Sequence, residues 1–427
     1  MLNKETGLRE LCYVVNIDAI EPIIGSDNCE AAIVGGWKVM VRKETFKAGD
    51  PAIYFEIDSK VDTSKPEFAF LEKKHGAIKT QKYTFGGKNP GFYSQGLLMS
   101  AEDFGWEIIT TLIVDKKVSF IKDNLGKEHI PGTESTFLTE QLGVTYYVSE
   151  DNKRKARSNP DTRINAALAR HPWVAKKFGK FIKKNKVARR VFIFLFGKKK
   201  DVSATAFPTK FPFIKKTDQE RAENMTWVLE DKTPYIVTQK CDGSSGTYIL
   251  ERKPFGKFEF YVCSRNVRQL TPNQKSYYEE NYYWECAIKY DIENKLKDYL
   301  IKHPELDYVC WQGEVCAPNI QQNPQGLTET HLFCFHMIDS EIGKYDIRDA
   351  VKIWKEYNME TVPVIDENYI LPDDFEEFKE SSEGFYDASV CEGKTNCKRE
   401  GFVYYKTTDP NFSFKNVSRS YLLKHQS

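Results

Sequence analysis

Short apolar runs separated by turn residues mark the first part of the chain. The runs lie at residues 12–15, 31–34, 37–41 and 52–57. Gly35-Gly36 and the segment 48–51 stand between them, and glycine and proline favour chain reversals. Residues 91–99 are typical of a further strand, entered from a loop with proline and glycine. Closely spaced short strands of this kind predict a small β-barrel or β-sandwich over residues 1–150.

An OB barrel is one form that such a domain can take. The common role of that barrel is to hold nucleic acid. A barrel with a purely structural role is the alternative, and the apolar pattern alone does not separate the two.

Residues 151–204 differ in charge from the preceding part of the chain. Lysine and arginine recur from Lys153 to Lys200, whereas Asp151 and Asp161 are the only acids between residues 151 and 200. Apolar residues fall at helical spacings at Val174, Phe178, Phe181, Ile182 and Val187. A phosphate-binding arm, a membrane-surface helix and a solvated linker all fit such a stretch. We expect a linker or insertion that faces nucleic acid, because the following segment indicates a polyanionic substrate.

From residue 205 onward, apolar strands alternate with helical patterns. Strands are expected at residues 235–238, 247–250, 261–263, 309–316, 331–339 and 401–406. A short helix is expected at residues 219–224, and an aromatic helical stretch at residues 277–299. The chain is therefore predicted to be an α+β protein whose third part, residues 205–427, combines antiparallel sheets with helices.

Lys240 lies at the tight turn between two of these strands. It begins the sequence Lys240-Cys241-Asp242-Gly243, and a glycine at such a turn lets a ligand approach the backbone closely. A lysine can act as a nucleophile when burial or a neighbouring cation favours loss of its proton. A surface hairpin with an ordinary lysine is the alternative for so short a motif.

Composition excludes some classes of protein. The 427 residues are 41% hydrophobic and 29% charged, with a net charge of +1, as in ordinary globular proteins. Ten cysteines show neither a C-x-x-C pair nor zinc spacing, which predicts reduced thiols. The polar amino terminus predicts no signal peptide, and the longest apolar run, residues 191–196, is too short to span a bilayer. We expect an intracellular protein with no membrane role, in the cytoplasm or in the nucleus or an organelle.

Further motifs follow Lys240 in a definite order. They are Ser264-Arg265-Asn266, Gly313-Glu314, an apolar strand with Phe335, Glu400-Gly401-Phe402-Val403, and a strand with Lys415. This order resembles motifs I, Ia, III, IIIa, IV and V of the covalent nucleotidyltransferases, which include DNA ligases, RNA ligases and capping enzymes. The sequence in and around these motifs is most similar to RNA ligases of the Deinococcus type, in which an OB domain precedes the nucleotidyltransferase domain. The similar phrases lie at residues 36–39, 54–58, 94–97, 216–221, 317–321 and 421–425.

The resemblance implies a role for each motif residue. Lys240 would attack the α-phosphorus of ATP, and Mg²⁺ or Mn²⁺ and basic side chains nearby would disfavour its ammonium form. Glu400 would bind the metal directly or through water, with Asp242 as a further candidate. Glu314 would accept hydrogen bonds from the ribose hydroxyls. The remaining expected nucleotide contacts are Gly243, Ser245, Arg265, Phe335 and Lys415.

Two of these assignments have competitors. Phe335 would stack on adenine, but Phe333 lies two positions earlier on the same strand. Lys415 would neutralise charge on the α-phosphate as it is attacked, which makes it a catalytic residue beside Lys240 and Glu400. The commoner form of this motif is Lys-x-Lys, and here Ser413 or Val417 stands in place of the second lysine. The candidates for the missing cation are Arg419 and Lys406.

The resemblance implies an ATP-dependent RNA ligase of three steps. AMP passes from ATP to Lys240, then to an RNA 5′-phosphate, and an adjacent 3′-OH finally expels it. Ligases of this type seal nicks in duplexes with RNA on the 3′-OH side, so the expected partner is a nicked RNA or RNA/DNA duplex, bound by a monomer. The alternatives are another covalent nucleotidyltransferase, such as a DNA ligase or a capping enzyme, and a non-catalytic RNA-binding protein on a ligase fold.

Overall fold

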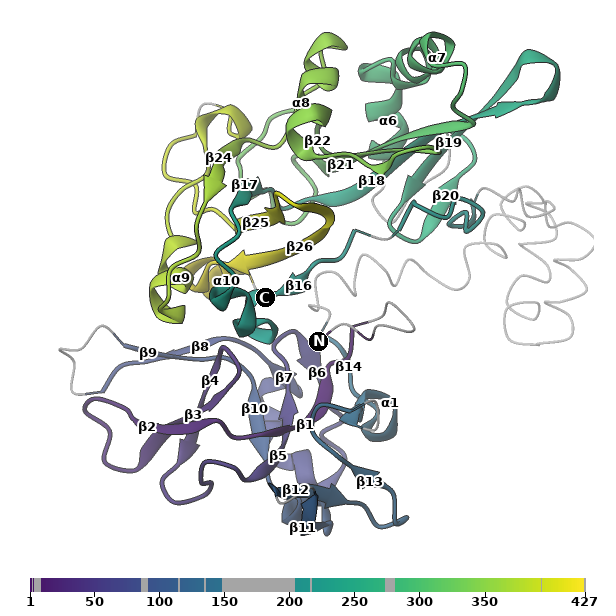
Figure 1. Ribbon diagram of the computed structural model, residues 1–427. Coiled ribbons are helices and arrows are strands. Elements are labelled where there is room, and N and C mark those ends of the chain that lie inside the picture. Colours follow the sequence, from purple (N-terminus) through teal and green to yellow (C-terminus); the bar gives the residue numbers. More distant parts are fainter. Residues whose placement is uncertain are drawn as a thin grey trace, which may run out of the picture.

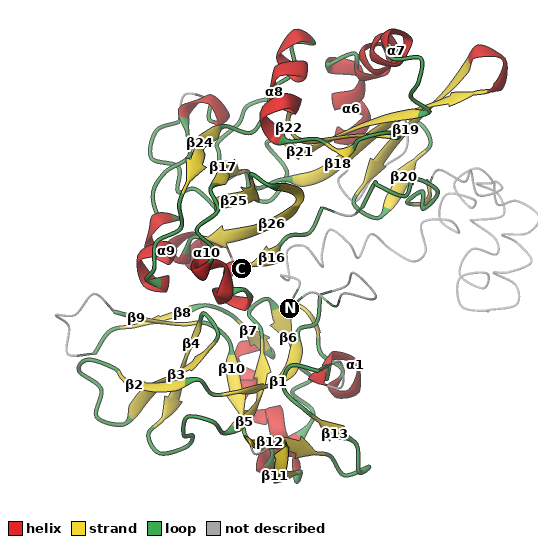
Figure 2. Ribbon diagram, viewed as in Figure 1, coloured by secondary structure: helices red, strands yellow, loops and turns green. Residues whose placement is uncertain are grey.

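The computed structural model of the chain describes residues 1, 3, 9–85, 91–113, 116–133, 136–147, 204–215, 217–272, 281–392 and 394–425. These residues form an N-terminal β-domain and a larger C-terminal domain (Figure 1). Strands dominate both, as Figure 2 shows. Residues 151–203 of the expected basic segment 151–204 lie outside the described residues. Across the described ranges, no helix is both long and apolar enough to cross a membrane.

Small antiparallel sheets build the N-terminal domain, with the orders β1-β5-β10, β2-β3-β4, β14-β6-β7, β8-β9 and β11-β12-β13. The strands are β1 (Cys12–Asn16), β2 (Ala19–Pro22), β3 (Cys29–Val34), β4 (Trp37–Arg42), β5 (Pro51–Phe55), β6 (Ser59–Lys60), β7 (Ala77–Ile78), β8 (Gln81–Tyr83), β9 (Phe92–Ser94), β10 (Leu97–Met99), β11 (Glu107–Ile113), β12 (Lys116–Lys122), β13 (Glu128–His129) and β14 (Thr145–Tyr146). Short helical turns join them at η1 (Pro66–Lys74), η2 (Glu102–Phe104) and α1 (Thr139–Leu142). The predicted β-domain is confirmed.

Strand β5 divides the apolar core of this domain in two. Successive side chains of a strand point to opposite faces. Ile53 and Phe55 therefore belong to one buried cluster, and Ala52 and Tyr54 belong to another. The second cluster faces the C-terminal domain and includes residues of it.

The single strand expected at residues 91–99 is two strands, β9 and β10, on different sheets. Gly96 lies between them with φ 106°, a conformation that favours glycine. A Cβ atom at this position would lie 2.4 Å from the ring of Tyr54. The chain therefore changes sheets where only glycine fits against the core.

Two sheets form the C-terminal domain, with the orders β15-β20-β19-β18-β21-β22-β23 and β16-β26-β25-β17-β24. The strands are β15 (Ala204–Ala206), β16 (Glu220–Arg221), β17 (Tyr235–Lys240), β18 (Ser244–Lys253), β19 (Lys257–Ser264), β20 (Val267–Gln269), β21 (Tyr308–Cys316), β22 (His331–Asp339), β23 (Gly343–Lys344), β24 (Val364–Tyr369), β25 (Gly401–Lys406) and β26 (Asp409–Val417). The helices are α6 (Tyr282–Lys289), α7 (Ile292–Lys302), α8 (Ile347–Glu356), α9 (Phe375–Ser381) and α10 (Arg419–His425), with short turns η4 (Ala222–Asn224), η5 (Thr226–Glu230), η6 (Pro254–Gly256) and η7 (Ala388–Val390).

Helices α6, α7 and α8 lie on one side of the seven-stranded sheet (Figure 2). Their apolar side chains and those of the sheet form the largest buried cluster, which includes Leu296, Trp311 and Trp354. This packing leaves the other side of the sheet to face the five-stranded sheet. Both sheets are antiparallel except where β16 pairs with β26 in parallel.

Two helix predictions need correction. Of the short helix expected at residues 219–224, the structure has the 3-10 turn η4 over Ala222–Asn224, whereas Glu220 and Arg221 form β16 and pair with Phe414 and Lys415 of β26. Pairing with a strand far along the sequence overrides the local propensity. The aromatic stretch at residues 277–299 is split into α6 and α7, and Asp291, with φ 50°, interrupts it. Residues 277–280 of that stretch lie outside the described residues.

The two domains meet through the segment 220–224 and through α10. Asn224 accepts a hydrogen bond from the Trp37 indole at 2.6 Å and donates one to Glu56 at 3.0 Å. Arg221 forms an ion pair with Asp58 at 2.8 Å. We call these contacts, together with the packing of α10 on the N-terminal core, the domain interface.

Candidate active site

A cavity between the two sheets of the C-terminal domain gathers most of the motif residues. Its walls come from β17, β18, β21, β22, β25 and β26 and from the segment 217–219. The sequence-predicted residues on these walls are Lys240, Gly243, Ser245, Arg265, Glu314, Phe335 and Lys415. Glu400 and Asp242 are not wall residues, but both lie close to Lys240, as the contacts below show.

Lys240 ends strand β17, directly opposite Gly401 of β25. Its Nζ atom donates a hydrogen bond to Glu400 Oε2 at 2.9 Å. Burial lowers the pKa of Lys240, but the charges of Glu400 and Glu314 outweigh burial and raise that pKa above its usual value. In the protein without ligands the carboxylates prevail, and the expectation that Mg²⁺ or Mn²⁺ and basic side chains disfavour the ammonium form stays a prediction for the metal-bound site. Here Lys240 is an ammonium group held by carboxylates.

Three carboxylates surround this ammonium group. Burial raises the pKa of Glu314 to about 7, against the opposing charge of Lys240. Burial and the charge of Glu400 raise the pKa of Asp242, whose carboxylate accepts a hydrogen bond from Tyr421. The Tyr386 hydroxyl is buried without a hydrogen-bond partner, and its raised pKa reflects burial first and then the charges of Glu400 and Asp242. Oxygen donors with excess negative charge fit a divalent cation such as Mg²⁺ or Mn²⁺.

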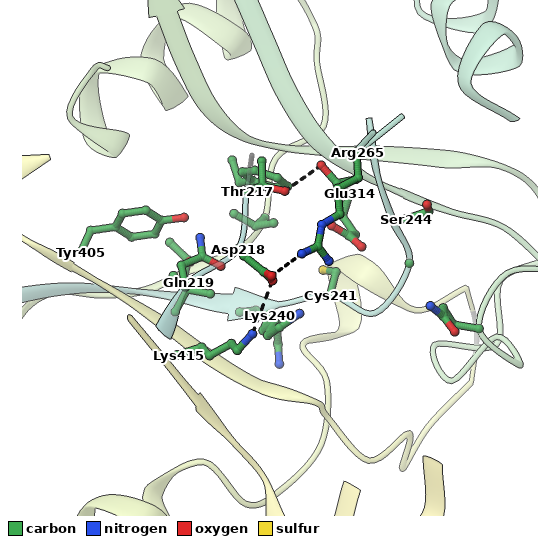
Figure 3. Close-up of a pocket in the computed structure, with 18 residues that line it drawn as sticks. Thr217, Asp218, Gln219, Lys240, Cys241, Ser244, Arg265, Glu314, Tyr405 and Lys415 are labelled. Atoms are coloured by element: carbon green, nitrogen blue, oxygen red, sulfur yellow. Dashed lines mark hydrogen bonds and ion pairs between the residues drawn. The ribbon is translucent and has the colours of Figure 1, made fainter. Parts of the chain in front are cut away.

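Asp218 lies between Arg265 and Lys415, which are cationic wall residues of the cavity like Lys240, as Figure 3 shows. It forms an ion pair with Arg265, and its Oδ1 atom is 3.9 Å from the Nζ atom of Lys415. Burial lowers the pKa of Lys415 to about 8, although Asp218 opposes this. Arg265 and Lys415 share the single negative charge of Asp218, so this part of the cavity has an excess of positive charge. Such an excess favours binding of a polyphosphate.

The turn after Lys240 is packed too closely for a side chain at Gly243. A Cβ atom there would lie 2.4 Å from the carbonyl oxygen of Val315 on the neighbouring strand. Just after this turn, Ser245 Oγ accepts a hydrogen bond from the hydroxyl group of Thr217 at 2.9 Å. The glycine of the motif therefore brings β18 against β21, so that Ser245 lies opposite Glu314 in the sheet.

Phe335, not Phe333, faces the cavity. Phe335 is a wall residue, whereas Phe333 is 2% exposed and its ring stacks on His331 at 5.6 Å. In the pairing of β21 with β22, Gln312 lies opposite His336 and Gly313 opposite Cys334, so the register shift falls at Phe335, whereas Phe333 is paired with Glu314. The aromatic wall for a nucleobase is therefore Phe335, with Tyr405 also on the wall.

Neither candidate for the second motif cation reaches the cavity. Arg419 pairs with Glu376 at 2.7 Å, and Lys406 pairs with Asp231. Both contacts lie away from the wall residues. The cation that accompanies Lys415 in the described part of the chain is Arg265, and Ser413 and Val417 bring no charge.

Comparisons with known proteins agree with this geometry. Residues 11–100 match the family model of an OB-fold domain, and residues 233–419 match that of RNA ligases. The N-terminal domain is thus similar to OB-fold domains and the C-terminal domain to RNA ligases, and we name the two domains the OB-fold domain and the RNA ligase domain after these matches.

Solved structures of similar fold span both domains. The Naegleria gruberi RNA ligase with PPi is 24% identical, with a TM-score of 0.65, and the match covers 98% of this chain and 99% of that one. A variant of that ligase with ATP and Mn is 24% identical, with a TM-score of 0.65 and 98% of each chain covered. A variant with AMP and Mn is 23% identical, with a TM-score of 0.66 and coverage of 98% and 99%. A search of curated proteins finds no match.

Several wall residues of the RNA ligase domain were missed by sequence reasoning. They include Asp218, Gln219, Thr238, Gln239, Gln321 and Tyr405. Thr238 and Tyr405 could have been found from the sequence. Thr238 lies two positions before Lys240, and Tyr405 lies two positions after Val403 of the motif at 400–403, and residues two positions apart point to the same face of a strand. Asp218 lies in the segment 216–221, which carries part of the resemblance described above, but this segment has no regular period that would show which of its side chains reaches the site.

Proposed function

We propose that this chain is an ATP-dependent RNA ligase that seals breaks with 3′-OH and 5′-phosphate ends. The supporting observation is the contact of Lys240 with Glu400 beside a cavity with two cationic side chains, inside a domain that matches the RNA ligase model. A nucleophile, an anion site and an aromatic wall are the three parts that a nucleotidyl transfer to lysine needs.

In the first step, the Nζ atom of Lys240 attacks the α-phosphorus of ATP. A phosphorus–nitrogen bond forms, the bond to the β-phosphate oxygen breaks, and pyrophosphate leaves. The ammonium form must first lose a proton, and the Glu400 carboxylate is the acceptor within hydrogen-bond distance. Lys415 and Arg265 stabilise the charge on the phosphates as the bond breaks.

The same walls support adenosine recognition. Phe335 offers a face for the adenine ring, and Glu314 offers acceptors for the ribose hydroxyls. The Naegleria ligase was solved with ATP, with AMP and with PPi, which supports a chain of similar fold using ATP. Gly243 and Ser245 lie on the rim of the turn, where the phosphates would pass.

Glu400 and Asp242 are the residues that we propose to hold Mg²⁺ or Mn²⁺, in line with the Mn in the Naegleria structures. A divalent ion, when bound, neutralises phosphate charge during the transfer. Until then the carboxylates hold Lys240 and keep its amine pointed toward the cavity wall.

The RNA steps follow from the resemblance to ligases of the Deinococcus type. AMP would pass from Lys240 to an RNA 5′-phosphate, and a 3′-OH would then expel it. We propose nicked duplexes with RNA on the 3′-OH side as substrates. The OB-fold domain would hold the duplex, and the protein would act as a monomer. All ten cysteines are free thiols, which supports an intracellular location.

The first test is label transfer from α-³²P-ATP with Mn²⁺ or Mg²⁺ and no RNA, followed by denaturing electrophoresis. We expect a labelled protein band that disappears in Lys240→Ala. Lys232→Ala is the matched control, because Lys232 forms an exposed pair with Asp373 far from the motif residues. Its band should equal that of the unchanged protein.

Other outcomes redirect the proposal. Label from α-³²P-GTP but not from ATP would indicate a capping enzyme, and no label from either would leave an RNA-binding protein on a ligase fold. Nicked duplexes with RNA or DNA at the 3′-OH end then test the substrate. Equal sealing of the two would contradict the RNA requirement.

A further inference from the structure

The hydroxyl of Tyr421, in the terminal helix α10, donates a hydrogen bond to Asp242 beside Lys240. The two residues are 179 positions apart in the chain. Figure 1 shows α10 where the OB-fold domain and the RNA ligase domain meet. The proposed chemistry assigns no role to this helix.

Packing fixes the position of the Tyr421 ring. The ring is 5% exposed and belongs to the buried cluster of the OB-fold domain, with Trp37 and Tyr54. Its other face stacks on His425, with the ring centroids 4.4 Å apart. A ring held on both faces leaves its hydroxyl little freedom, so the donor is aimed before any ligand arrives.

Ser418, the residue before α10, is tied to the backbone of Glu400, the acidic residue that contacts Lys240. Ser418 donates its backbone N–H to the carbonyl oxygen of Glu400 at 2.8 Å, and its Oγ accepts from the backbone N–H of Tyr421 at 3.2 Å. Glu383 accepts from the Ser418 hydroxyl at 2.8 Å. The helix thus contacts the backbone at Glu400 and the side chain of Asp242.

Asp242 needs such a donor. Its carboxylate lies near those of Glu400 and Glu314, and like charges push each other away. A hydrogen bond from a clamped phenol holds the carboxylate in one orientation against this repulsion. Among the described residues, Tyr421 is the one whose side chain donates a hydrogen bond to this carboxylate.

We propose that Tyr421 is a positioning residue, whose hydroxyl fixes the orientation of the Asp242 carboxylate relative to Lys240 and Glu400 during transfer of AMP to Lys240. The inference rests on the proposed function. It extends that function by making the terminal helix a part of the site.

The test compares single-turnover label transfer in Tyr421→Phe and Tyr235→Phe across ATP and Mn²⁺ concentrations. Tyr235 is the matched control, because its hydroxyl is also buried but has no hydrogen-bond partner. We expect Tyr421→Phe to lower the maximal rate about tenfold or more, as loss of a hydrogen bond to a charged group does. The ATP concentration at half-maximal rate should change less than twofold, because Asp242 is not a wall residue of the cavity. Tyr235→Phe should match the unchanged protein.

A double-mutant cycle separates positioning from folding. If Tyr421 acts through Asp242, then adding Tyr421→Phe to Asp242→Asn should cause no further loss of rate. The free energies of unfolding of the same single and double variants measure the coupling between Tyr421 and Asp242 independently of any ligase activity. Thermal unfolding checks that Tyr421→Phe and Tyr235→Phe are equally folded.

Equal rates for Tyr421→Phe and Tyr235→Phe would overturn the inference, and so would a full additional loss in the double variant. Absence of label in the unchanged protein would instead overturn the proposed function. In that case the unfolding cycle still decides whether Tyr421 and Asp242 are coupled, and an additive cycle would overturn the positioning role as well.

Discussion

The cavity and the domain interface each hold a lysine bonded to a glutamate, and the two lysines have different surroundings. Lys379, at the interface side of the RNA ligase domain, is 1% exposed and donates to Glu223, to the Asn416 side chain and to the Val417 carbonyl oxygen, at 2.7, 2.7 and 3.0 Å. Lys240, beside the cavity, donates to Glu400 alone among the contacts of the described residues, and its side chain is 22% exposed.

An ammonium group has three protons to donate. All three of Lys379 are used by protein acceptors, so the group is satisfied without a ligand and joins β26 to the segment that contacts the OB-fold domain. Lys240 has protons left over and faces open space. Saturation by the protein therefore distinguishes the structural lysine from the reactive one better than burial does, since both side chains are largely buried.

The largest effect that tests this contrast is loss of stability at Lys379. Lys379→Met removes the cation but leaves Glu223 buried, which should lower the free energy of unfolding by about 3–5 kcal/mol. Lys232→Met is the control at an exposed pair with Asp373, where the loss should be under about 1 kcal/mol. Chemical denaturation measures both. Equal losses would contradict the structural role of Lys379.

A smaller effect is expected for the two phenylalanines of β22, of which Phe335 lines the cavity and Phe333 is buried. Phe335→Leu removes a face for adenine, so the ATP concentration at half-maximal label transfer should rise about threefold to tenfold. Phe333→Leu alters a buried contact, and it should leave that concentration unchanged while lowering the free energy of unfolding by about 1 kcal/mol. The reverse result would show that Phe333 is the stacking residue.

The smallest expected effect is a pH dependence at the interface. Glu56 is fully buried, and although burial raises its pKa, the charge of Arg9 and the hydrogen bond from Asn224 help to lower it below the usual value. Because the folded pKa is lowered, the stabilisation is present above the unfolded pKa of about 4.3 and is lost as the pH falls below it.

We therefore expect Glu56→Gln to lose about 1 kcal/mol less stability than the unchanged protein between pH 7 and pH 3.5. Denaturation at the two pH values measures the difference. Glu21→Gln, at an exposed pair with Lys38, is the control and should follow the unchanged protein. A pH dependence of Glu56→Gln equal to that of the unchanged protein would show that this carboxylate does not stabilise the interface.

The amino-acid sequence by itself determined the β-domain, the α+β class, the turn at Lys240 and the order of the motifs. These features are local: an apolar run forms a strand, a glycine permits a turn, and a motif is read in consecutive residues. The sequence also named part of the cavity's walls, because Lys240, Glu314, Phe335 and Lys415 each lie in or beside an apolar strand.

Only the tertiary structure decided which side chains meet. Asp218 reaches Lys415 and Arg265 because β16, which begins two residues beyond it, pairs in parallel with β26, and this pairing also replaced the first part of the helix expected at residues 219–224. Tyr421 reaches Asp242 because the terminal helix is packed against the OB-fold domain. Contacts between segments about 180 positions apart depend on sheet pairing and core packing, and no local pattern records either.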